Sequence, residues 1–402
     1  MTNGNPLGTS ASLPQPDAAA TEASAALCRR IADEIGAAGG WMPFSRFMEQ
    51  ALYAPGLGYY SGGAHKFGAS GDFVTAPELT PLFARTLAAQ AEQVMALSRP
   101  EIIEAGAGSG ALATELLLAL EQRDALPVRY RILELSGELR QRQRQMIESR
   151  APHLAGRVEW LDALPQRFSG LVLGNEVVDA MPVALVVWQQ EGEKLSIVER
   201  GVSLSEAGGF IWADRPAAGA LLAAAELLAA AEQLPATAPY LSEIGLAGRA
   251  WVGEWGRILE QGALLLLDYG FPRREYYLAE RDCGTLMCHY RHHSHGDPFW
   301  LPGLNDVTAH VDFTAIAEAG FDAGLDVLGY TGQAQFLFNC GITGLLEGLQ
   351  NDGDRVYLAE AKRVGKLVSP AEMGELFKVI ALGRGIAGPL VGFSRGDRVH
   401  TL

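Results

Sequence analysis

Residues 101–110 have the sequence EIIEAGAGSG, and this stretch decides the fold. Its apolar start at 101–104 is typical of a short buried strand, and the apolar spacing at 111–120 predicts a helix directly after it. Gly106, Gly108 and Gly110 let the backbone turn tightly between the two and approach a ligand with no side chain in the way. The stretch therefore predicts a strand, a glycine turn and a helix.

Further elements continue this alternation along the chain. Apolar or alternating runs predict strands at 129–135, 157–161, 170–173 and 263–267, and a charged helix at 136–149. Alternating strands and helices imply right-handed crossovers and a parallel sheet. A final strand at 377–382 is expected to pair with 327–330. The expected fold class is α/β, with a doubly wound Rossmann-like sheet.

The segments outside this sheet suggest a division of the chain. Helices are predicted at 23–35, 45–53 and 81–97, and a period-2 pattern at 183–214 predicts a β-meander, followed by an Ala- and Leu-rich helix at 216–233. We expect four parts: a disordered tail at 1–22, a helical N-terminal cap at 23–98 that contributes to the active site, a core at 99–182 and 258–402, and an inserted subdomain at 183–257 for a substrate or partner.

Composition excludes several classes of protein. The 402 residues carry a net charge of -15, which argues against a protein that coats nucleic acid. The acidity suits recognition of a cationic side chain and equally suits an ordinary soluble protein. Four scattered cysteines do not form a disulfide framework and favour a reducing compartment. No apolar run reaches the ~18 residues that span a bilayer, and residues 1–22 resemble no secretory or transit signal.

The glycine spacing narrows the range of possible ligands. The pattern is G-x-G-x-G, whereas dinucleotide sites use G-x-G-x-x-G with a helix N-terminus aimed at a pyrophosphate. A ligand without phosphates, S-adenosylmethionine, suits it better. Glu134 at the end of the second strand is placed to accept from two ribose hydroxyls, or is an exposed strand-end glutamate. Asp162 would accept from the adenine amine or cap a turn. The predicted cofactor residues are Glu104, Gly106, Gly108, Gly110, Glu134, Asp162 and Asn175.

The fourth strand ends in the polar stretch GNEVVDAMP at 174–182. Ligands bind at the carboxyl ends of strands in open α/β sheets, so this stretch should face the reacting group. Glu176 and Asp179 would share one face if a helical turn follows the strand. With Asn175 they would hold a guanidinium and aim its nitrogen at a sulfonium methyl. The alternative is a helix cap plus a solvated acid. Asp72 is a further candidate for this pocket.

A histidine cluster at 289–295 invites a metal site, with His289, His292, His293 and His295 close together. The surrounding acids, prolines and glycines resemble a polar loop. We expect no metal and a contribution to a substrate pocket.

Several segments together resemble one family, the MidA-type class I methyltransferases, which include the mitochondrial arginine methyltransferase that acts in assembly of respiratory complex I. They cover about residues 40–385 and comprise 58–60, 71–73, 75–78, 104–110, 174–176, 179–180 with Pro182, 268–270, 284–286, 306–313 and 373–379.

This resemblance implies a seven-stranded class I methyltransferase fold and, in the mitochondrial member, symmetric dimethylation of an arginine on a complex I subunit. The implied partner is a protein substrate, by likeness a complex I subunit. A homodimer is a separate expectation. Because no Arg-rich leader is present, we expect a bacterial cytoplasmic homologue, whereas a eukaryotic one would be mitochondrial. The alternatives are a non-catalytic assembly factor that keeps the fold and a small-molecule methyltransferase.

Overall fold

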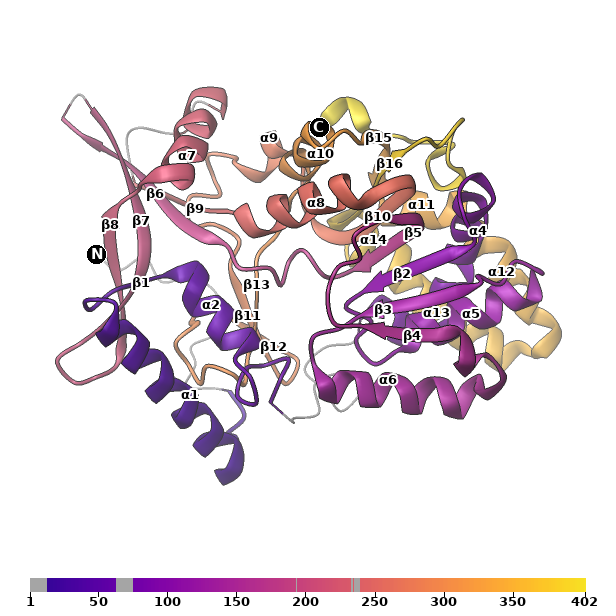
Figure 1. Ribbon diagram of the computed structural model, residues 1–402, viewed down its shortest axis with the longest axis horizontal. Coiled ribbons are helices and arrows are strands. Elements are labelled where there is room, and N and C mark those ends of the chain that lie inside the picture. The colour runs from indigo at the N-terminus through magenta and orange to yellow at the C-terminus, as the bar shows by residue number, and fades with distance from the viewer. Residues whose placement is uncertain (1–12, 63–74, 193, 233, 235–238) are drawn as a thin grey trace. The chain divides into compact units, whose positions relative to one another are not determined.

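The structure is a computed structural model that describes residues 13–62, 75–192, 194–232, 234 and 239–402 (Figure 1). The chain divides into two compact units. Unit 1 comprises Met1–Phe73, Asp179–Gly248 and Arg273–Val311, and unit 2 comprises Val74–Val178, Arg249–Pro272 and Asp312–Leu402. Each unit has its own apolar cluster of buried side chains.

Unit 2 is built on one large sheet with the strand order β15-β16-β10-β5-β2-β3-β4. Neighbours from β10 to β4 run parallel, and β16 is antiparallel to both β10 and β15. The strands are β2 (Glu101–Ala105), β3 (Arg129–Leu133), β4 (Val158–Leu161), β5 (Phe168–Asn175), β10 (Leu259–Phe271), β15 (Asp326–Gly332) and β16 (Phe377–Arg384). The early strands and the C-terminal strand β16 belong to the same sheet (Figure 1).

The doubly wound α/β fold is therefore confirmed, as is the pairing of the last strand with the segment around 327–330. The strand number is not confirmed as seven. The two-residue strand β14 (Val311–Asp312) also pairs with β10, so the sheet has eight strands among the described residues. β14 was not predicted because two residues are too few to show a period-2 pattern.

Helices surround this sheet and supply the apolar core of unit 2. Leu112, Leu116 and Leu120 of α5 are buried at helical spacing, together with Ile102 of β2 and Leu265 of β10. The helices are α3 (Ala76–Leu79), α4 (Pro81–Leu97), α5 (Ala111–Gln122), α6 (Gly137–Arg150), α8 (Leu246–Ile258), α10 (Phe313–Asp322), α11 (Gln333–Asn339), α12 (Ile342–Gly348), α13 (Asp354–Val368) and α14 (Met373–Leu376), with short 3-10 turns at Pro152–Arg157, Leu349–Asp352, Val391–Phe393 and Val399–Thr401.

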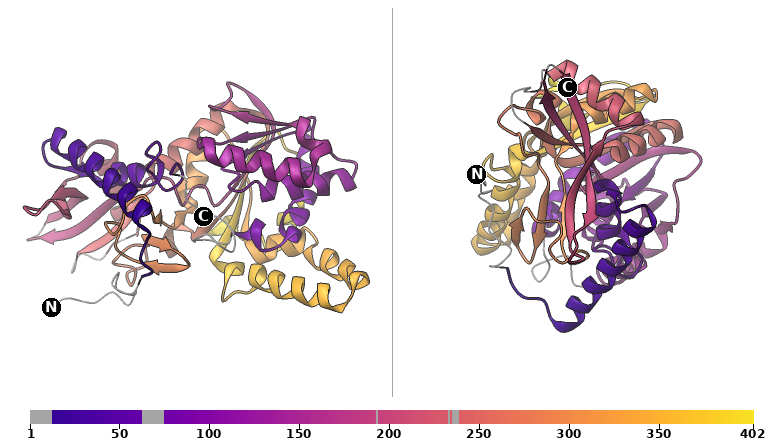
Figure 2. Two further views of the ribbon diagram at one scale, coloured as in Figure 1. Left: turned by 90° about the horizontal axis from the view of Figure 1, so that it is seen from below. Right: turned by 90° about the vertical axis from the view of Figure 1, so that its left-hand side faces the viewer.

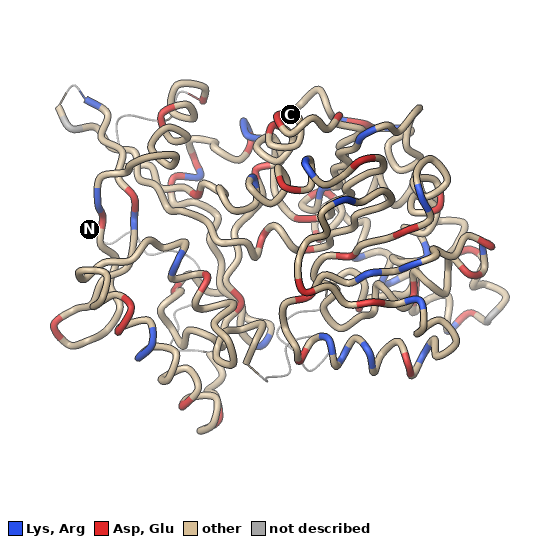
Figure 3. Tube along the Cα trace, in the orientation of Figure 1, with Lys and Arg blue, Asp and Glu red and all other residues tan. Residues whose placement is uncertain are grey.

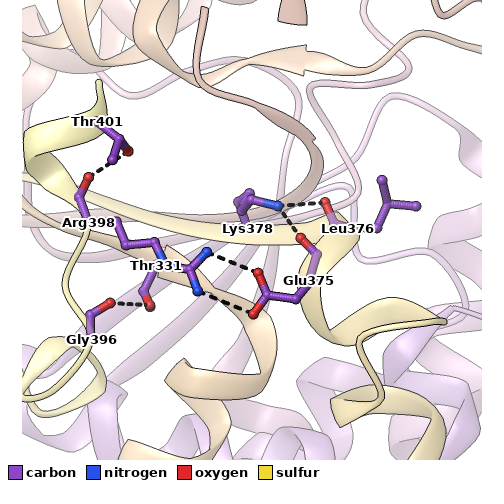
Figure 4. A network of polar contacts seen from close by, with 7 residues as sticks. All are labelled: Thr331, Glu375, Leu376, Lys378, Gly396, Arg398 and Thr401. Carbon is purple, nitrogen blue, oxygen red and sulfur yellow. Dashed lines mark hydrogen bonds and ion pairs between the residues drawn. The ribbon is translucent and has the colours of Figure 1, made fainter. Parts of the chain in front are cut away.

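The C-terminus is tied to the edge of this sheet (Figure 4). The Arg398 guanidinium forms a two-point ion pair with the Glu375 carboxylate at 2.9 and 3.3 Å. The backbone N–H of Arg398 donates to the Tyr330 carbonyl (2.6 Å), and the Thr331 hydroxyl donates to the Gly396 carbonyl (2.8 Å). These contacts hold the last residues of the chain against β15.

Unit 1 joins the N-terminal helices to the predicted insertion. Its five-stranded antiparallel sheet consists of β1 (Met42–Pro43), β6 (Ala184–Glu191), β7 (Lys194–Leu204), β8 (Phe210–Pro216) and β9 (Tyr240–Ile244). Helices α1 (Ala18–Ala37) and α2 (Phe44–Tyr53) lie against this sheet (Figures 1 and 2). Phe44, Phe47 and Val202 share one buried core. The predicted meander is thus part of a unit that includes the N-terminal helices.

The remaining elements of unit 1 are short. Helices α7 (Gly219–Glu232) and α9 (Arg273–Tyr276) accompany a three-stranded sheet of β12 (His293–His295), β11 (Met287–Tyr290) and β13 (Asp306–Thr308). Helix α1 begins inside the expected 1–22 tail, because the Asp17 carboxylate caps it by accepting from the Ala20 N–H at 2.8 Å. Residues 1–12 of that tail lie outside the described residues. None of the described helices combines the length and apolarity needed to cross a membrane.

Candidate cofactor site

The glycine turn joins β2 to α5 in a conformation that favours glycine. Gly106, Gly108 and Gly110 have φ angles of +64°, +52° and +86°. A Cβ added at Gly110 would lie 3.0 Å from the Cα of Gln143, and one at Gly106 would lie 3.3 Å from a methyl carbon of Val177. The turn is therefore confined by α6 and by the loop after β5, and its backbone carries no side chain at these three positions.

Glu134 directly follows β3 and is buried. Its Oε1 accepts from the Ser136 backbone N–H at 2.9 Å, and its Oε2 accepts from the Gln143 side-chain amide at 3.0 Å. Burial raises the pKa of Glu134, while these donors oppose that shift. Each oxygen has two lone pairs, so the oriented carboxylate keeps capacity to accept from hydroxyl groups.

Glu104 in β2 is a second buried carboxylate near the turn. The Tyr130 hydroxyl of β3 donates to it at 2.6 Å. Burial raises the pKa of Glu104 to about 7, the Tyr130 hydrogen bond lowers it, and the charge of Glu134 raises it. Burial and the neighbouring charge of Glu134 therefore favour the protonated form of Glu104 up to about neutral pH.

Asp162 follows β4 and has a side chain that is 90% exposed. It pairs with the Arg140 guanidinium of α6 at 2.6 Å. Arg140 also donates to the carbonyls of Glu134 and Leu161, each at 2.7 Å. It thereby holds together the ends of β3 and β4. Leu135, the residue after Glu134, is 77% exposed and offers an apolar side chain next to it.

The loop after β5 carries the predicted reacting residues. Asn175 ends the strand, and its side-chain amide donates to the Glu176 carboxylate at 3.1 Å. The Asn175 Oδ1 is buried and has no hydrogen-bond partner among the residues that the structure describes. Glu176 takes a φ of +52°, which is unusual for a residue other than glycine. An unsatisfied buried oxygen beside a carboxylate residue with a strained backbone is typical of a functional site.

Asp268 at the end of β10 fixes this loop. Its carboxylate accepts from the backbone N–H groups of Val177 (3.2 Å) and Val178 (2.9 Å). Glu176 and Asp179 would share one face only if a helical turn followed β5, and no such turn forms. The reason is that the left-handed backbone at Glu176 and the bonds to Asp268 direct the chain into bends instead. Asp179 belongs to unit 1, where its carbonyl accepts from the Ala309 N–H at 3.1 Å.

Unit 1 surrounds the segment after Asp179 with tyrosines and a second acid. The Tyr53 hydroxyl donates to the Ala180 carbonyl, and the Tyr60 hydroxyl donates to the Asp306 carboxylate, both at 2.9 Å. The two rings stack with centroids 5.4 Å apart. Burial, followed by the charge of Asp306, raises the pKa of Tyr60 well above its usual value. Asp72, also predicted for the pocket, lies outside the described residues.

The histidine cluster forms the hairpin of β11 and β12. His295 is buried, and its two ring nitrogens contact the Asn305 side chain (3.2 Å) and the Asp297 N–H (3.3 Å). Burial lowers the pKa of His289 to about 4. Among the residues that the structure describes, no group of three or more His, Cys, Asp or Glu could hold a metal ion.

Three positions matter here to which the sequence alone assigned no role: Gln143, Asp268 and Glu243. Glu243 is buried in unit 1 and accepts from the N–H groups of Thr285 (2.8 Å) and Leu286 (2.9 Å). The only sequence signal for Gln143 is an amide within the apolar stripe of a helix. Asp268 lies in one of the segments of the family resemblance, but its partners and those of Glu243 are distant in sequence, so no local pattern predicts their contacts.

The fold and the site together define a class of protein. An open α/β sheet presents a side-chain-free turn next to a carboxylate with acceptor capacity, as a nucleoside cofactor without a pyrophosphate requires. These residues fit S-adenosylmethionine, and the class is that of the Rossmann-like methyltransferases.

Comparison with known proteins gives the family. Residues 82–331 match the family described as "Putative S-adenosyl-L-methionine-dependent methyltransferase", and the chain belongs to it. The chain is similar, at 26% identity over 89% of its length and 86% of the relative, to protein arginine methyltransferase NDUFAF7, mitochondrial, of Danio rerio. The Drosophila melanogaster homologue is 27% identical over 88% of this chain and 86% of its own. The resemblance to MidA-type enzymes is thereby confirmed.

A solved structure supports the same conclusion. It is described as a "likely methyl transferase" from Burkholderia thailandensis bound to S-adenosyl-homocysteine. It is 53% identical, covers 97% of this chain and 100% of its own, and superposes with a TM-score of 0.92. The cofactor predicted from the sequence is the one that defines this family.

Proposed function

We propose that this chain transfers methyl groups from S-adenosylmethionine to a guanidinium nitrogen of an arginine in a protein substrate. The support for the acceptor is the similarity to relatives named as protein arginine methyltransferases. By the same likeness, symmetric dimethylarginine is the expected product. The observation that carries the proposal is the loop 175–178, where Glu176 has a strained, positive-φ backbone and the neighbouring Val177 side chain lies against Gly106 of the glycine turn.

The cofactor roles proposed here rest on the contacts of these residues. Gly106, Gly108 and Gly110 would allow the backbone to contact the cofactor, Glu134 would accept from its ribose hydroxyls, and Asp162 from its adenine amine. Leu135 would cover the base. Glu104 would contribute a second buried acid next to Glu134. The Asn175 Oδ1, which has no hydrogen-bond partner among the described residues, would accept from the cofactor's amino group.

The proposed reacting roles belong to Glu176 and Asp179. Bound S-adenosylmethionine supplies a sulfonium methyl group that a nitrogen nucleophile takes in an in-line displacement. Glu176 would accept hydrogen bonds from the guanidinium, keep one nitrogen aligned, and take up the proton that this nitrogen releases. Asp179 would hold the remaining guanidinium N–H groups.

Incubation of the full chain with labelled S-adenosylmethionine and cell lysate tests the proposal. We expect label on protein, located on arginine by mass spectrometry of the labelled peptide. Label on a metabolite instead would identify a small-molecule methyltransferase. Failure to bind S-adenosylmethionine in a calorimetric titration would leave an assembly factor that only keeps the fold.

A further inference from the structure

Gln143 is the buried polar residue of a helix whose other face is charged. Leu139, Gln143 and Ile147 form the buried stripe of α6, four residues apart. The remaining positions are mostly charged or polar, and Figure 3 shows charges of both signs along this helix. Leucine or isoleucine would be expected at such a position on packing grounds, because a buried amide costs free energy unless it is fully hydrogen-bonded. A glutamine there needs a specific reason.

All the polar atoms of the Gln143 amide are in use. The Nε2 donates to the Gly108 carbonyl at 3.1 Å and to the Glu134 carboxylate at 3.0 Å. The Oε1 accepts from the Trp160 indole N–H at 2.8 Å. One side chain therefore joins the glycine turn after β2, the carboxylate after β3 and a residue of β4. These are three adjacent strands of the sheet.

We propose that Gln143 is a positioning residue that sets the distance between the glycine turn and Glu134 and keeps that carboxylate aimed at the cofactor ribose. The proposal rests on the proposed function, since it assumes that S-adenosylmethionine binds here. Trp160 orients the amide by occupying its oxygen, so both N–H groups must point to Gly108 and Glu134. Gly110 makes the arrangement sterically possible, because a Cβ there would meet the Gln143 backbone.

The charged groups around Glu134 make its ionisation a readout of this role. Glu104 faces it from β2 with Tyr130 behind, and Arg140 of α6 faces it while paired with Asp162. Burial already raises the pKa of Glu134, and the Gln143 amide is one of the donors that lower it. Without that donor the pKa rises further, so the carboxylate loses its charge at a higher pH.

Calorimetric titration of S-adenosylmethionine from pH 6 to 8.5 tests the proposal in the full chain. Gln143→Leu should lose about tenfold in affinity at pH 8.5, in keeping with a lost bond to a charged group. The loss should grow as the pH falls. Gln143→Glu should show the opposite trend, because a second carboxylate can share a proton with Glu134 at low pH but repels it once both ionise. Gln145→Leu, an exposed position on the same helix, is the matched control.

The outcomes separate the proposals. If the unchanged chain binds no S-adenosylmethionine, the proposed function fails. If it binds but both Gln143 variants keep its affinity, or lose affinity equally at every pH, then Gln143 only packs the helix and the positioning role is overturned. Circular dichroism of both variants establishes that they fold, and a folded Gln143→Glu with the reversed pH trend supports the proposal even if Gln143→Leu is unstable.

Discussion

Two regions of unit 2 differ in how their polar atoms are held. In the cofactor end, which comprises residues 104–110, Glu134 and Gln143, positive φ angles fall on glycines and the buried acids accept from named donors. In the loop 175–178, a glutamate takes the positive φ, and the Asn175 Oδ1 has no hydrogen-bond partner within the described part of the chain. The buried acids of the first region are hydrogen-bonded, and the region is preorganised for binding. The second keeps strain and an open acceptor, as a region that must engage a reacting group would.

The largest effect should come from Glu176→Gln. This change removes the proposed proton acceptor in the loop and leaves the cofactor end untouched. Turnover should fall by about 10³-fold, within the range of general base catalysis, while calorimetric affinity for S-adenosylmethionine stays within about twofold. Glu148→Gln, exposed on α6, is the control. Unchanged turnover would exclude Glu176 as the proton acceptor. A loss of affinity for S-adenosylmethionine would show that Glu176 helps to bind the cofactor.

A pH effect on stability should come from Glu104 in the cofactor end. Its pKa is about 7 in the fold against a usual value of 4.5. The folded state therefore binds more protons between these values, and its stability is lost as the pH rises through them. At about 1.4 kcal/mol per pKa unit, this amounts to about 2–3 kcal/mol between pH 5 and 8.

Glu104→Gln cannot ionise, so the free energy of unfolding in urea should fall less over this range than it does in the unchanged chain. The Glu148→Gln control should behave like the unchanged chain. If the free energy of unfolding changed equally with pH in all three proteins, the pKa of Glu104 would not be raised in the fold.

Gly110→Ala should break the preorganisation of the cofactor end. The φ of +86° is unfavourable for alanine, and the added Cβ would lie 3.0 Å from the Gln143 Cα. We expect a loss of about 2 kcal/mol in unfolding free energy together with a weaker affinity for S-adenosylmethionine. Gly137→Ala, at the start of α6 with open space around its Cβ, should cost nothing in either measurement. Retained affinity with Gly110→Ala would show that the turn tolerates displacement.

The same contrast shows what the sequence could predict. The strands, the glycine turn and the positions of Glu134 and Glu176 follow from local periodicity and from the rule that strand ends gather at one edge. The helical turn that would give Glu176 and Asp179 a shared face does not form, because the backbone there is bonded to Asp268, some ninety residues away in the chain. Gln143 acquires its role only through Gly108, Glu134 and Trp160, which no spacing rule connects. Local pattern predicts the elements, whereas the partners of buried polar groups depend on tertiary packing.

The smallest effect should come from Asp162→Asn, which sharpens the boundary of the cofactor end. Its exposed ion pair with Arg140 contributes at most about 1 kcal/mol to stability. If the carboxylate also accepts from the adenine amine, affinity for S-adenosylmethionine should fall by about threefold to fivefold, since the amide oxygen of asparagine still accepts but carries no charge. The loss should be smaller for a cofactor analogue without that amine. Equal losses of affinity for both ligands would show that Asp162 does not contact the adenine amine. Its role would then be to hold Arg140, which links the ends of β3 and β4.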